Sequence, residues 1–443
     1  MHRLLTLVGL TGLLAIAWAI SGQQVQGQAQ ANLGEPTILG RYSLNPVALK
    51  AAQERAWPGQ VRDDRGLQLG GLFSGLHHMS GDPENTFYAV ADRGPNGQVR
   101  VGEDRRRTFP VPEYSPVIYK LRTVGDQLQI IGQTIIRTRS GQPVTGISNT
   151  EADETPYSFD GQTRLALNPN GLDIEGLARA QDGSFWVCDE YSPSLAQIAP
   201  NGTVLYRLVP GGLTLTADTD VRAVLPAIYS KRRGNRGFEG LTLSRDGSRI
   251  FAVLQSPLDF PTKDIGRASR MIRLLVVDTR SLRPVAEYVY VAEPSRTFRE
   301  ADQGEMKLSD VAFVNPTTLL VDERTDKVAH IYQIDLSRAT NILGSRWSDL
   351  QNTGNSLEAL TPAQLAENNI TPVGKTLLVD LSKLPNMPDK IEGLTVVDAN
   401  TIAVGNDNDF GFDRFTPQGR AVNNSLSNLL LTIRLPRALP LAR

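Results

Sequence analysis

The fold is decided by residues 173–191, whose sequence is DIEGLARAQDGSFWVCDEY. An apolar segment that begins with Glu175-Gly176 is followed by an Asp-Gly pair and then by a second apolar segment. Asp-Gly between two such segments is typical of a tight β-hairpin. Two more short apolar segments follow before residue 210, separated by Asn-Gly. The stretch therefore predicts a unit of four antiparallel strands.

The opening motif of this unit recurs along the chain. An acid followed by Gly-Leu, or by a similar pair, begins an apolar segment at Glu175, Glu239, Asp310 and Glu392, and a degenerate copy without the acid surrounds Ser74. Repeated four-stranded units are the signature of propeller blades. Five repeats are visible, and a sixth would have to lie within residues 141–170. We therefore predict an all-β protein, a β-propeller of five or six four-stranded antiparallel blades.

The two ends of the chain are expected to complete one blade together. The last repeat has only three predicted strands, whereas residues 37–44 form a strand that belongs to no repeat. Pairing these two parts would close the ring and remove an exposed sheet edge. We predict that residues 37–44 form the outer strand of the last blade. One domain would then span residues 32–443, with insertions at 141–170 and 348–376.

The first residues have the pattern of an export signal. An uncharged apolar run covers residues 4–20, and Ala29-Gln30-Ala31 has the small-x-small form of a cleavage site. We expect a signal peptide over residues 1–31 and a periplasmic or extracellular protein, the alternative being an uncleaved membrane anchor. No second apolar run of this length follows, so no stable membrane insertion is expected after cleavage.

The composition excludes several classes of protein. A net charge of −1 over 443 residues gives no basis for nucleic-acid binding. Cys188 is the only cysteine, so no internal disulfide is expected, and its apolar surroundings indicate a packed thiol. The four histidines form no zinc-binding pattern. We expect a monomer that acts on a small molecule.

The repeated acids indicate a metal site. Equivalent positions in successive blades lie in a ring around one axis, and like charges gathered there need a cation among them. A second set of acids follows the first hairpin of the repeats. Ligands made only of oxygen favour Ca²⁺. The predicted ligands are Glu175, Glu239, Asp310, Glu392, Asp92, Asp189, Asp322 and Asp407. The alternative is that these acids cap turns and are purely architectural.

Basic residues lie close to these acids in the sequence. They are Arg93, Arg236, Lys307 and Lys390. Internal salt bridges are one interpretation. The other is that they bind an anionic substrate such as a phosphate ester, since the arginine fork fits such groups. In that hypothesis Ca²⁺ activates water, and Glu175, Glu239, Arg93 and Arg236 are the catalytic residues.

Several motifs resemble those of a known family, the phytase-like family, which carries the description "esterase-like activity of phytase". The motifs are residues 91–97, 173–177, 186–191, 235–241, 254–258, 390–394 and 406–411. The resemblance covers about residues 65–435 and implies a β-propeller and hydrolysis of esters. We expect an exported, calcium-dependent hydrolase of phosphoric or other esters. The alternatives are a calcium-bearing lactonase or sugar-ester hydrolase, and a non-enzymatic propeller that binds a ligand or partner.

Overall fold

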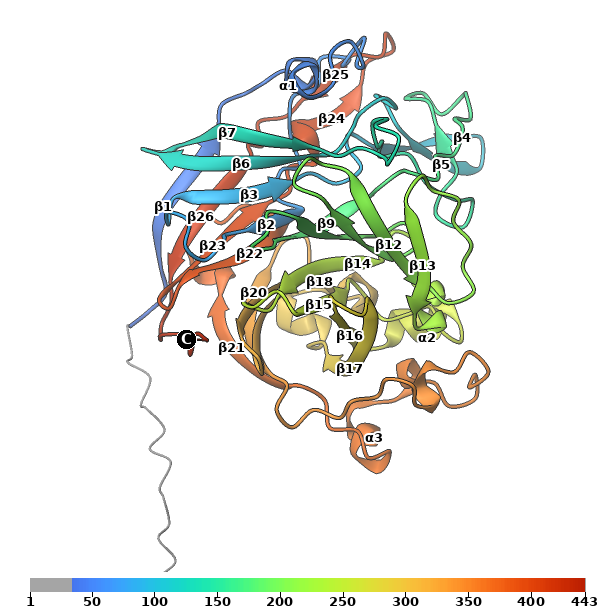
Figure 1. Cartoon of the computed structure of the whole chain (residues 1–443), viewed down its shortest axis with the longest axis vertical. Coiled ribbons are helices and arrows are strands. Elements are labelled where there is room, and N and C mark those ends of the chain that lie inside the picture. Colours follow the sequence, from blue (N-terminus) through green and yellow to red (C-terminus); the bar gives the residue numbers. More distant parts are fainter. Residues whose placement is uncertain (1–33, 443) are drawn as a thin grey trace, which may run out of the picture.

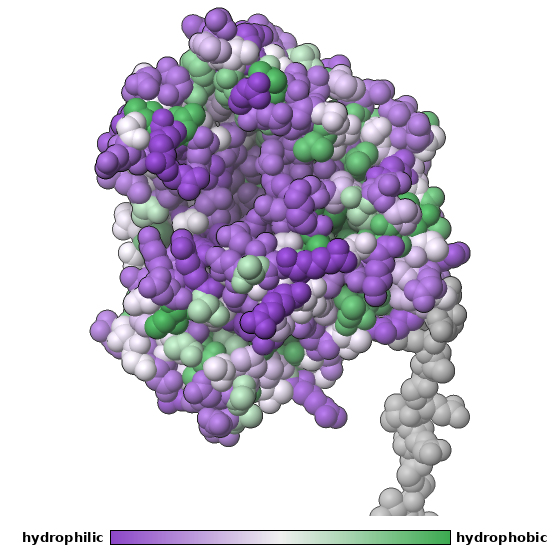
Figure 2. Space-filling model, turned by 180° about the vertical axis from the view of Figure 1, so that it is seen from behind, coloured by the Kyte–Doolittle hydropathy of each residue, from purple (hydrophilic) through white to green (hydrophobic). Residues whose placement is uncertain are grey.

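The computed structural model describes residues 34–442, which consist mainly of β-strands. The strands form sheets arranged around a common centre (Figure 1). The expected signal peptide of residues 1–31 lies outside the described residues. Within residues 34–442, no helix has both the length and the apolar character needed to cross a bilayer. The face shown in Figure 2 is mostly hydrophilic, and a hollow opens in its upper half.

Three of the predicted repeats form separate sheets, which we call blades 2, 3 and 4. Blade 2 contains β9 (Ile174–Arg179), β10 (Phe185–Asp189), β11 (Ser194–Ile198) and β12 (Val204–Pro210), with β13 (Asp220–Leu225) parallel to β12. Blade 3 contains β14 (Phe238–Leu243), β15 (Arg249–Leu254), β16 (Met271–Asp278) and β17 (Arg283–Val291). Blade 4 contains β18 (Lys307–Asn315), β19 (Thr318–Arg324), β20 (Ala329–Asp335) and β21 (Gly374–Asp380).

Blades 1 and 5 share one eight-stranded sheet. Blade 1 contains β2 (Gly75–His77), β3 (Thr86–Val90), β6 (Val117–Val124) and β7 (Gln127–Ile135). Blade 5 contains β22 (Ile391–Asp398), β23 (Thr401–Asn406), β26 (Leu429–Arg434) and β1 (Thr37–Leu44). β1 pairs antiparallel with β26, so the N-terminal strand is the outer strand of blade 5, as the sequence predicts. Ser43 and Leu44 also pair in parallel with β7, which joins the outer edges of the two blades.

The first strands of the five blades form a closed ring. β2 contacts β9, β9 contacts β14, β14 contacts β18, β18 contacts β22, and β22 contacts β2 again. These strands lie at the centre of the molecule (Figure 1). Residues 34–442 therefore contain five blades. The stretch 141–170 supplies no sixth blade, because its one described strand is the two-residue β8 (Pro156–Tyr157), which pairs with β5.

The glycine of the repeated motif lets these first strands approach one another. A Cβ atom on Gly240 would lie 2.6 Å from the Cα of Asp310 in the next blade. A Cβ atom on Gly176 would lie 2.8 Å from the backbone nitrogen of Leu241. Both distances are shorter than a van der Waals contact, and neighbouring backbone cannot yield as a flexible side chain can. The motif therefore has glycine because adjacent blades pack there, backbone against backbone.

The connections between strands carry the remaining elements. They include the helices α1 (Leu49–Ala56), α2 (Lys263–Ala268) and α3 (Pro362–Glu367), the hairpin β4 (Gly97–Val101) and β5 (Asp104–Thr108), and the hairpin β24 (Phe412–Phe415) and β25 (Ala421–Asn423). The insertion at 348–376 contains α3 and is anchored to blade 3 by a buried ion pair between Glu358 and Arg273.

Candidate metal centre

The first strands of blades 2 to 5 contain a β-bulge near their start, and motif acids occupy three of the bulges. In blade 2 the pairing with β10 passes from Ile174 to Gly176 and leaves Glu175 unpaired. The same irregularity in blades 3 and 5 leaves Glu239 and Glu392 unpaired. A bulge residue is released from the ladder and its side chain is re-aimed. The bulges therefore give the three acids equivalent places at one end of the ring.

The fourth expected member of this set, Asp310, is displaced by one residue. The bulge residue of blade 4 is Ser309, and Asp310 takes the place that glycine has in the other blades. The Asp310 carboxylate accepts hydrogen bonds from the backbone N–H groups of Val311 and Leu394, at 2.8 Å each. Asp310 thus links blade 4 to blade 5. The expected register with Glu175 is therefore not observed, and the Asp310 carboxylate is directed at backbone donors.

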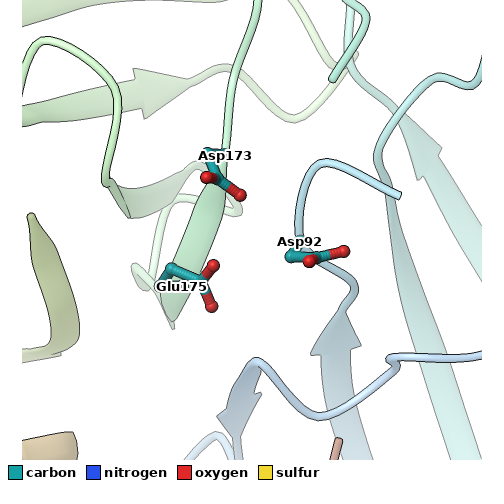
Figure 3. A group of neighbouring side chains, drawn as sticks. All are labelled: Asp92, Asp173 and Glu175. Carbon is teal, nitrogen blue, oxygen red and sulfur yellow. The ribbon is translucent and has the colours of Figure 1, made fainter. Parts of the chain in front are cut away.

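Three acids come together at this end of the ring. Asp92, in the loop after β3, Asp173, directly before β9, and Glu175, in the β9 bulge, offer oxygen atoms within 4.8 Å of one another. Figure 3 shows Asp173 and Glu175 projecting from the start of β9 toward Asp92. We call these three residues the acidic triad. The sequence predicts Asp92 and Glu175 as ligands but misses Asp173.

Backbone contacts hold the triad in place. Asp92 Oδ1 accepts a hydrogen bond from the Gly94 N–H at 2.8 Å, and Asp173 Oδ1 accepts one from the Arg93 N–H at 3.1 Å. The N–H of Asp173 donates to Asp189 Oδ1 at 2.8 Å. These bonds orient the triad without using all of its carboxylate oxygens.

Asp189 lies outside the triad and holds Asp173 in position through a hydrogen bond. Its second carboxylate oxygen accepts hydrogen bonds from Ser194 Oγ at 2.7 Å and from the guanidinium of Arg207, which is 1% exposed. Both Asp189 oxygens are therefore occupied by protein donors. The sequence predicts Asp189 as a metal ligand, and in the structure its oxygens accept hydrogen bonds from protein donors, among them the N–H of Asp173.

Burial makes it costly to ionise all of the triad carboxyl groups. Burial raises the pKa of Glu175 well above its usual value, and the charges of Glu239 and Asp173 raise it further. The pKa of Asp92 is raised in the same way, by burial first and then by Asp173. Burial also raises the pKa of Glu190, which follows β10, to about 7. In the protein alone, these groups gain by remaining protonated.

The triad fits a hard divalent cation. Within residues 34–442, the Glu175 carboxylate makes no hydrogen bond or ion pair. Asp173 Oδ2 and Glu239 Oε2 are buried without a hydrogen-bond donor, although Asp173 Oδ2 lies 3.2 Å from the Arg93 guanidinium. Buried anionic oxygens without partners are costly, and a cation between them would remove that cost. The donors are oxygen atoms only, which suits Ca²⁺.

An arginine side chain supplies positive charge next to the acids of blades 3 to 5. Arg324, at the end of β19, is 1% exposed. Its Nη2 donates to Glu392 Oε1, and its Nε donates to Ser309 Oγ at 2.6 Å. Burial alone would lower the pKa of Arg324, but the charges of Glu392, Asp326, Glu239 and Asp322 outweigh it and raise the pKa. Arg324 is not among the residues predicted from the sequence, although its guanidinium contacts the acids of the later blades.

A comparison of equivalent positions in the repeats identifies Arg324 as a candidate residue. Glu323 pairs with the residue before the blade 4 bulge, as Asp189 does in blade 2 and Asn406 does in blade 5. The next residue in each blade is therefore equivalent. It is Glu190 in blade 2, Asp407 in blade 5 and Arg324 in blade 4. A basic residue at a position that is acidic in two other repeats indicates a positive charge, supplied by the chain itself, that balances the neighbouring acids.

Three further predicted ligands lie outside the triad. Asp322 lies opposite Asp310 on the neighbouring strand, fully buried, and burial raises its pKa well above its usual value. Asp407 accepts a hydrogen bond from Lys390 Nζ at 2.6 Å, and this partner lowers its pKa although burial acts in the opposite direction. Glu392 is paired with Arg324. None of these three acids belongs to the triad.

The four predicted substrate-binding cations are engaged within the protein. Arg93 pairs with Glu154 at 2.8 Å and Asp173 at 3.2 Å, Lys307 pairs with Asp326 at 2.7 Å, and Lys390 pairs with Asp407 and Asp409. Arg236 donates to Ser256 Oγ and to the carbonyl oxygens of Gly304 and Met306, and it makes no hydrogen bond to a motif acid. These side chains therefore make internal contacts, as in the first interpretation of the sequence, and their binding of a substrate stays a prediction.

Comparison with known proteins gives a family and a secreted relative. A family model described as "Phytase-like: Esterase-like activity of phytase" matches residues 68–410. An uncharacterized secreted protein of Arthroderma benhamiae is 24% identical in an alignment of 300 residues, with coverage of 56% of this chain and 59% of the relative. The chain thus matches less than two thirds of that relative's length.

Similar solved structures share little sequence with this chain. The PQQ-bound aldose sugar dehydrogenase of Streptomyces coelicolor is 10% identical with a TM-score of 0.36, covering 92% of this chain and 100% of the enzyme. A luciferin-regenerating enzyme is 9% identical with a TM-score of 0.33, covering 82% of this chain and 92% of that enzyme. Similarity at this level says nothing about activity.

Proposed function

The chain belongs to the phytase-like family, and from this premise we propose that it is an exported ester hydrolase that uses a divalent cation, Ca²⁺, held by the acidic triad. The observation that carries the proposal is the convergence of Asp92, Asp173 and Glu175 within 4.8 Å. The family description supports ester hydrolysis, and the secreted relative supports export. The protein acts as a monomer on a small molecule.

The three triad residues contribute differently to the proposed cation site. Glu175 supplies a carboxylate with no competing partner, whereas Asp92 and Asp173 are oriented by the N–H groups of Gly94 and Arg93. The Arg93 guanidinium lies against Asp173 and is held in turn by Glu154, so Arg93 is a positioning residue. A bound Ca²⁺ supplies polarisation of the ester and a lowered pKa for a bound water.

Glu239 is suited to proton transfer at the same end of the ring. Its Oε1 accepts a hydrogen bond from Gln255, which leaves its buried Oε2 without a partner. Burial, followed by the charge of Glu190, raises the pKa of Glu239 well above its usual value, which favours the protonated form of this carboxyl group. A protonated carboxyl group can donate to the alcohol that leaves when an ester is hydrolysed.

A pocket beside Glu154 favours an anionic substrate. It has a volume of about 420 Å³, and its lining includes Arg105, Arg106 and Arg107 of the β4–β5 hairpin. Arg107 pairs with Glu154 at 3.0 Å, and Glu154 pairs with Arg93, which contacts the triad. The Arg105 side chain is exposed. Arg106 pairs with Asp104, so Arg105 is the arginine of this pocket that remains available for an anionic group.

The engagement of Arg236, Lys307 and Lys390 within the protein favours a second candidate, hydrolysis of a neutral lactone or sugar ester by the same acids. Such a substrate has no anionic group for these cations to bind. The two candidates differ in the substrate and agree on the metal.

A chelation assay tests both candidates. The purified protein is stripped with EDTA and assayed with and without Ca²⁺ on a phosphate monoester, a phosphate diester, a carboxylic ester and a lactone. We expect hydrolysis to disappear on chelation, to return with Ca²⁺, and to be lost in Glu175→Gln but retained in the exposed control Asp246→Asn. Activity that survives both chelation and Glu175→Gln would overturn the proposal. Metal analysis of the untreated protein accompanies the assay.

A further inference from the structure

A ring of apolar side chains closes the centre of the molecule behind the motif acids. The residues that follow the motif glycine, or Asp310 in blade 4, are Leu76, Leu177, Leu241, Val311 and Leu394, and each is at most 2% exposed. They come from all five first strands. Each lies two residues after Ser74 or a bulge residue. The ring therefore separates the acidic end of the strands from the opposite end.

A cavity lies on the other side of this ring. Its volume is about 240 Å³, and it is lined by residues from the first strands of all five blades and by Leu441 and Ala442. Most of its lining is apolar, for example Leu243, Phe313 and Val396. Its lining residues include two arginines and no aspartate or glutamate. This cavity, which we call the apolar chamber, thus favours negatively charged groups, whereas the acidic triad favours cations.

Two polar groups of the chamber lack partners. Within residues 34–442, the Arg179 guanidinium makes no hydrogen bond or ion pair. Its Cζ atom lies 5.2 Å from the centroid of the Tyr88 ring. The neighbouring His77 has a buried Nε2 atom without a hydrogen-bond partner. Burial, and then the charges of His78 and Arg179, lower the pKa of His77 to about 3, so the ring is neutral. Both groups can donate a hydrogen bond to an anion.

The other arginine of the chamber is already in use. Arg245 is exposed and donates to the carbonyl oxygen of Ala442, whose N–H donates to the Val314 carbonyl at 2.9 Å. This contact holds the Leu441–Ala442 segment at the border of the chamber. Among the described residues, Arg179 is therefore the arginine of the chamber whose guanidinium has no hydrogen-bond or ion-pair partner.

We propose that the apolar chamber binds a small apolar molecule that carries one anionic group, such as a medium-chain carboxylate. The carboxylate accepts hydrogen bonds from Arg179 and His77, and its chain packs on the leucine, valine and phenylalanine side chains of the first strands. The volume is below the roughly 300–1,000 Å³ of sites for drug-sized ligands, so the ligand is small. The proposal does not depend on the activity proposed for the acidic triad.

Octanoate is the probe for this site. Isothermal titration calorimetry is carried out on the full chain and on Arg179→Gln, with Arg280→Gln as a matched control at an exposed turn. We expect octanoate to bind the wild type and Arg280→Gln equally and to bind Arg179→Gln about tenfold more weakly or worse, because a charge-assisted hydrogen bond is lost. Octanol, which lacks the charge, should bind the wild type more weakly than octanoate.

A second variant tests whether the ligand lies in the chamber. Val396→Trp adds volume at a half-buried lining residue, and thermal unfolding shows whether the variant is folded. Octanoate binding should disappear in folded Val396→Trp and should be unchanged when EDTA removes metal from the acidic triad. Equal binding to wild type and Arg179→Gln, binding that persists in folded Val396→Trp, or no binding to the wild type below the micelle concentration would each overturn the proposal.

Discussion

Arg324 on β19 donates a hydrogen bond to Glu392 on β22, which places a fixed positive charge between blades 4 and 5. The acids of these blades thus have a counter-charge supplied by the chain. The acidic triad has a different balance. Arg93 contacts Asp173, but Glu175 has no cationic partner within residues 34–442. The chain itself thus supplies positive charge on one side of the ring, and on the other side the proposed cation would supply it.

The Arg324–Glu392 pair should be important for stability. Arg324→Met leaves Glu392 buried without its partner, and breaking a buried ion pair in this way typically costs about 3–5 kcal/mol. We expect the free energy of unfolding, measured by chemical denaturation, to fall by this amount. The double variant Arg324→Met with Glu392→Leu removes both charges and should recover most of the loss. Equal destabilisation in the single and double variants would contradict an electrostatic role.

Metal affinity should depend on Asp173 and not on Asp310. Asp173→Asn removes one charge from the triad, and we expect Ca²⁺ affinity to fall about tenfold or more, as for other altered metal sites. Asp310→Asn leaves the triad intact and should bind Ca²⁺ as the wild type does. Calorimetric titration of each folded variant measures this difference. The opposite ranking would restore Asp310 as a ligand and remove Asp173.

Acid should destabilise the protein partly through His77. The folded pKa of His77 is about 3, below its usual value of 6.5, so the unfolded chain binds a proton at His77 that the folded protein does not. Stability from this group is present above pH 6.5 and is lost as the pH falls from 6.5 toward 3.

His77→Asn removes this titration. We expect the free energy of unfolding of His77→Asn to decline less steeply with acid than that of the wild type between pH 6.5 and 4. Above pH 7 the two curves should run parallel. Denaturant unfolding at a series of pH values provides both curves. Parallel curves over the whole range would mean that His77 titrates alike in the folded and unfolded chains.

The repeats reveal the fold better than they reveal the site. Glu175-Gly176 and its copies mark the first strands correctly, and the spare strand at 37–44 indicates how blade 5 is completed. A bulge in the ladder, however, decides which residue turns out of it, and sequence spacing cannot show that Ser309 rather than Asp310 lies there. Pairing between distant loops, such as Arg93 with Glu154, is likewise set by three-dimensional packing.

The packing of neighbouring blades gives the last prediction. A Cβ atom at residue 240 would lie 2.6 Å from the Asp310 Cα, and the obstructing atoms belong to the backbone of blade 4. Gly240→Ala can therefore be accommodated only by separating blades 3 and 4. Overpacking of this kind costs about 1–3 kcal/mol or more. We expect a corresponding fall in the free energy of unfolding, measured by denaturation in urea.

Gly234→Ala is the matched control, because a Cβ atom at residue 234 meets nothing within 4 Å and the residue does not have a positive φ angle. It should change the free energy of unfolding by no more than about 0.5 kcal/mol. If both variants were equally stable, the motif glycine would have to be explained by something other than blade packing. If Gly240→Ala alone is destabilised, the Glu-Gly-Leu motif joins two constraints. Its acid occupies the bulge, and its glycine holds neighbouring blades close enough for acids from different blades to meet.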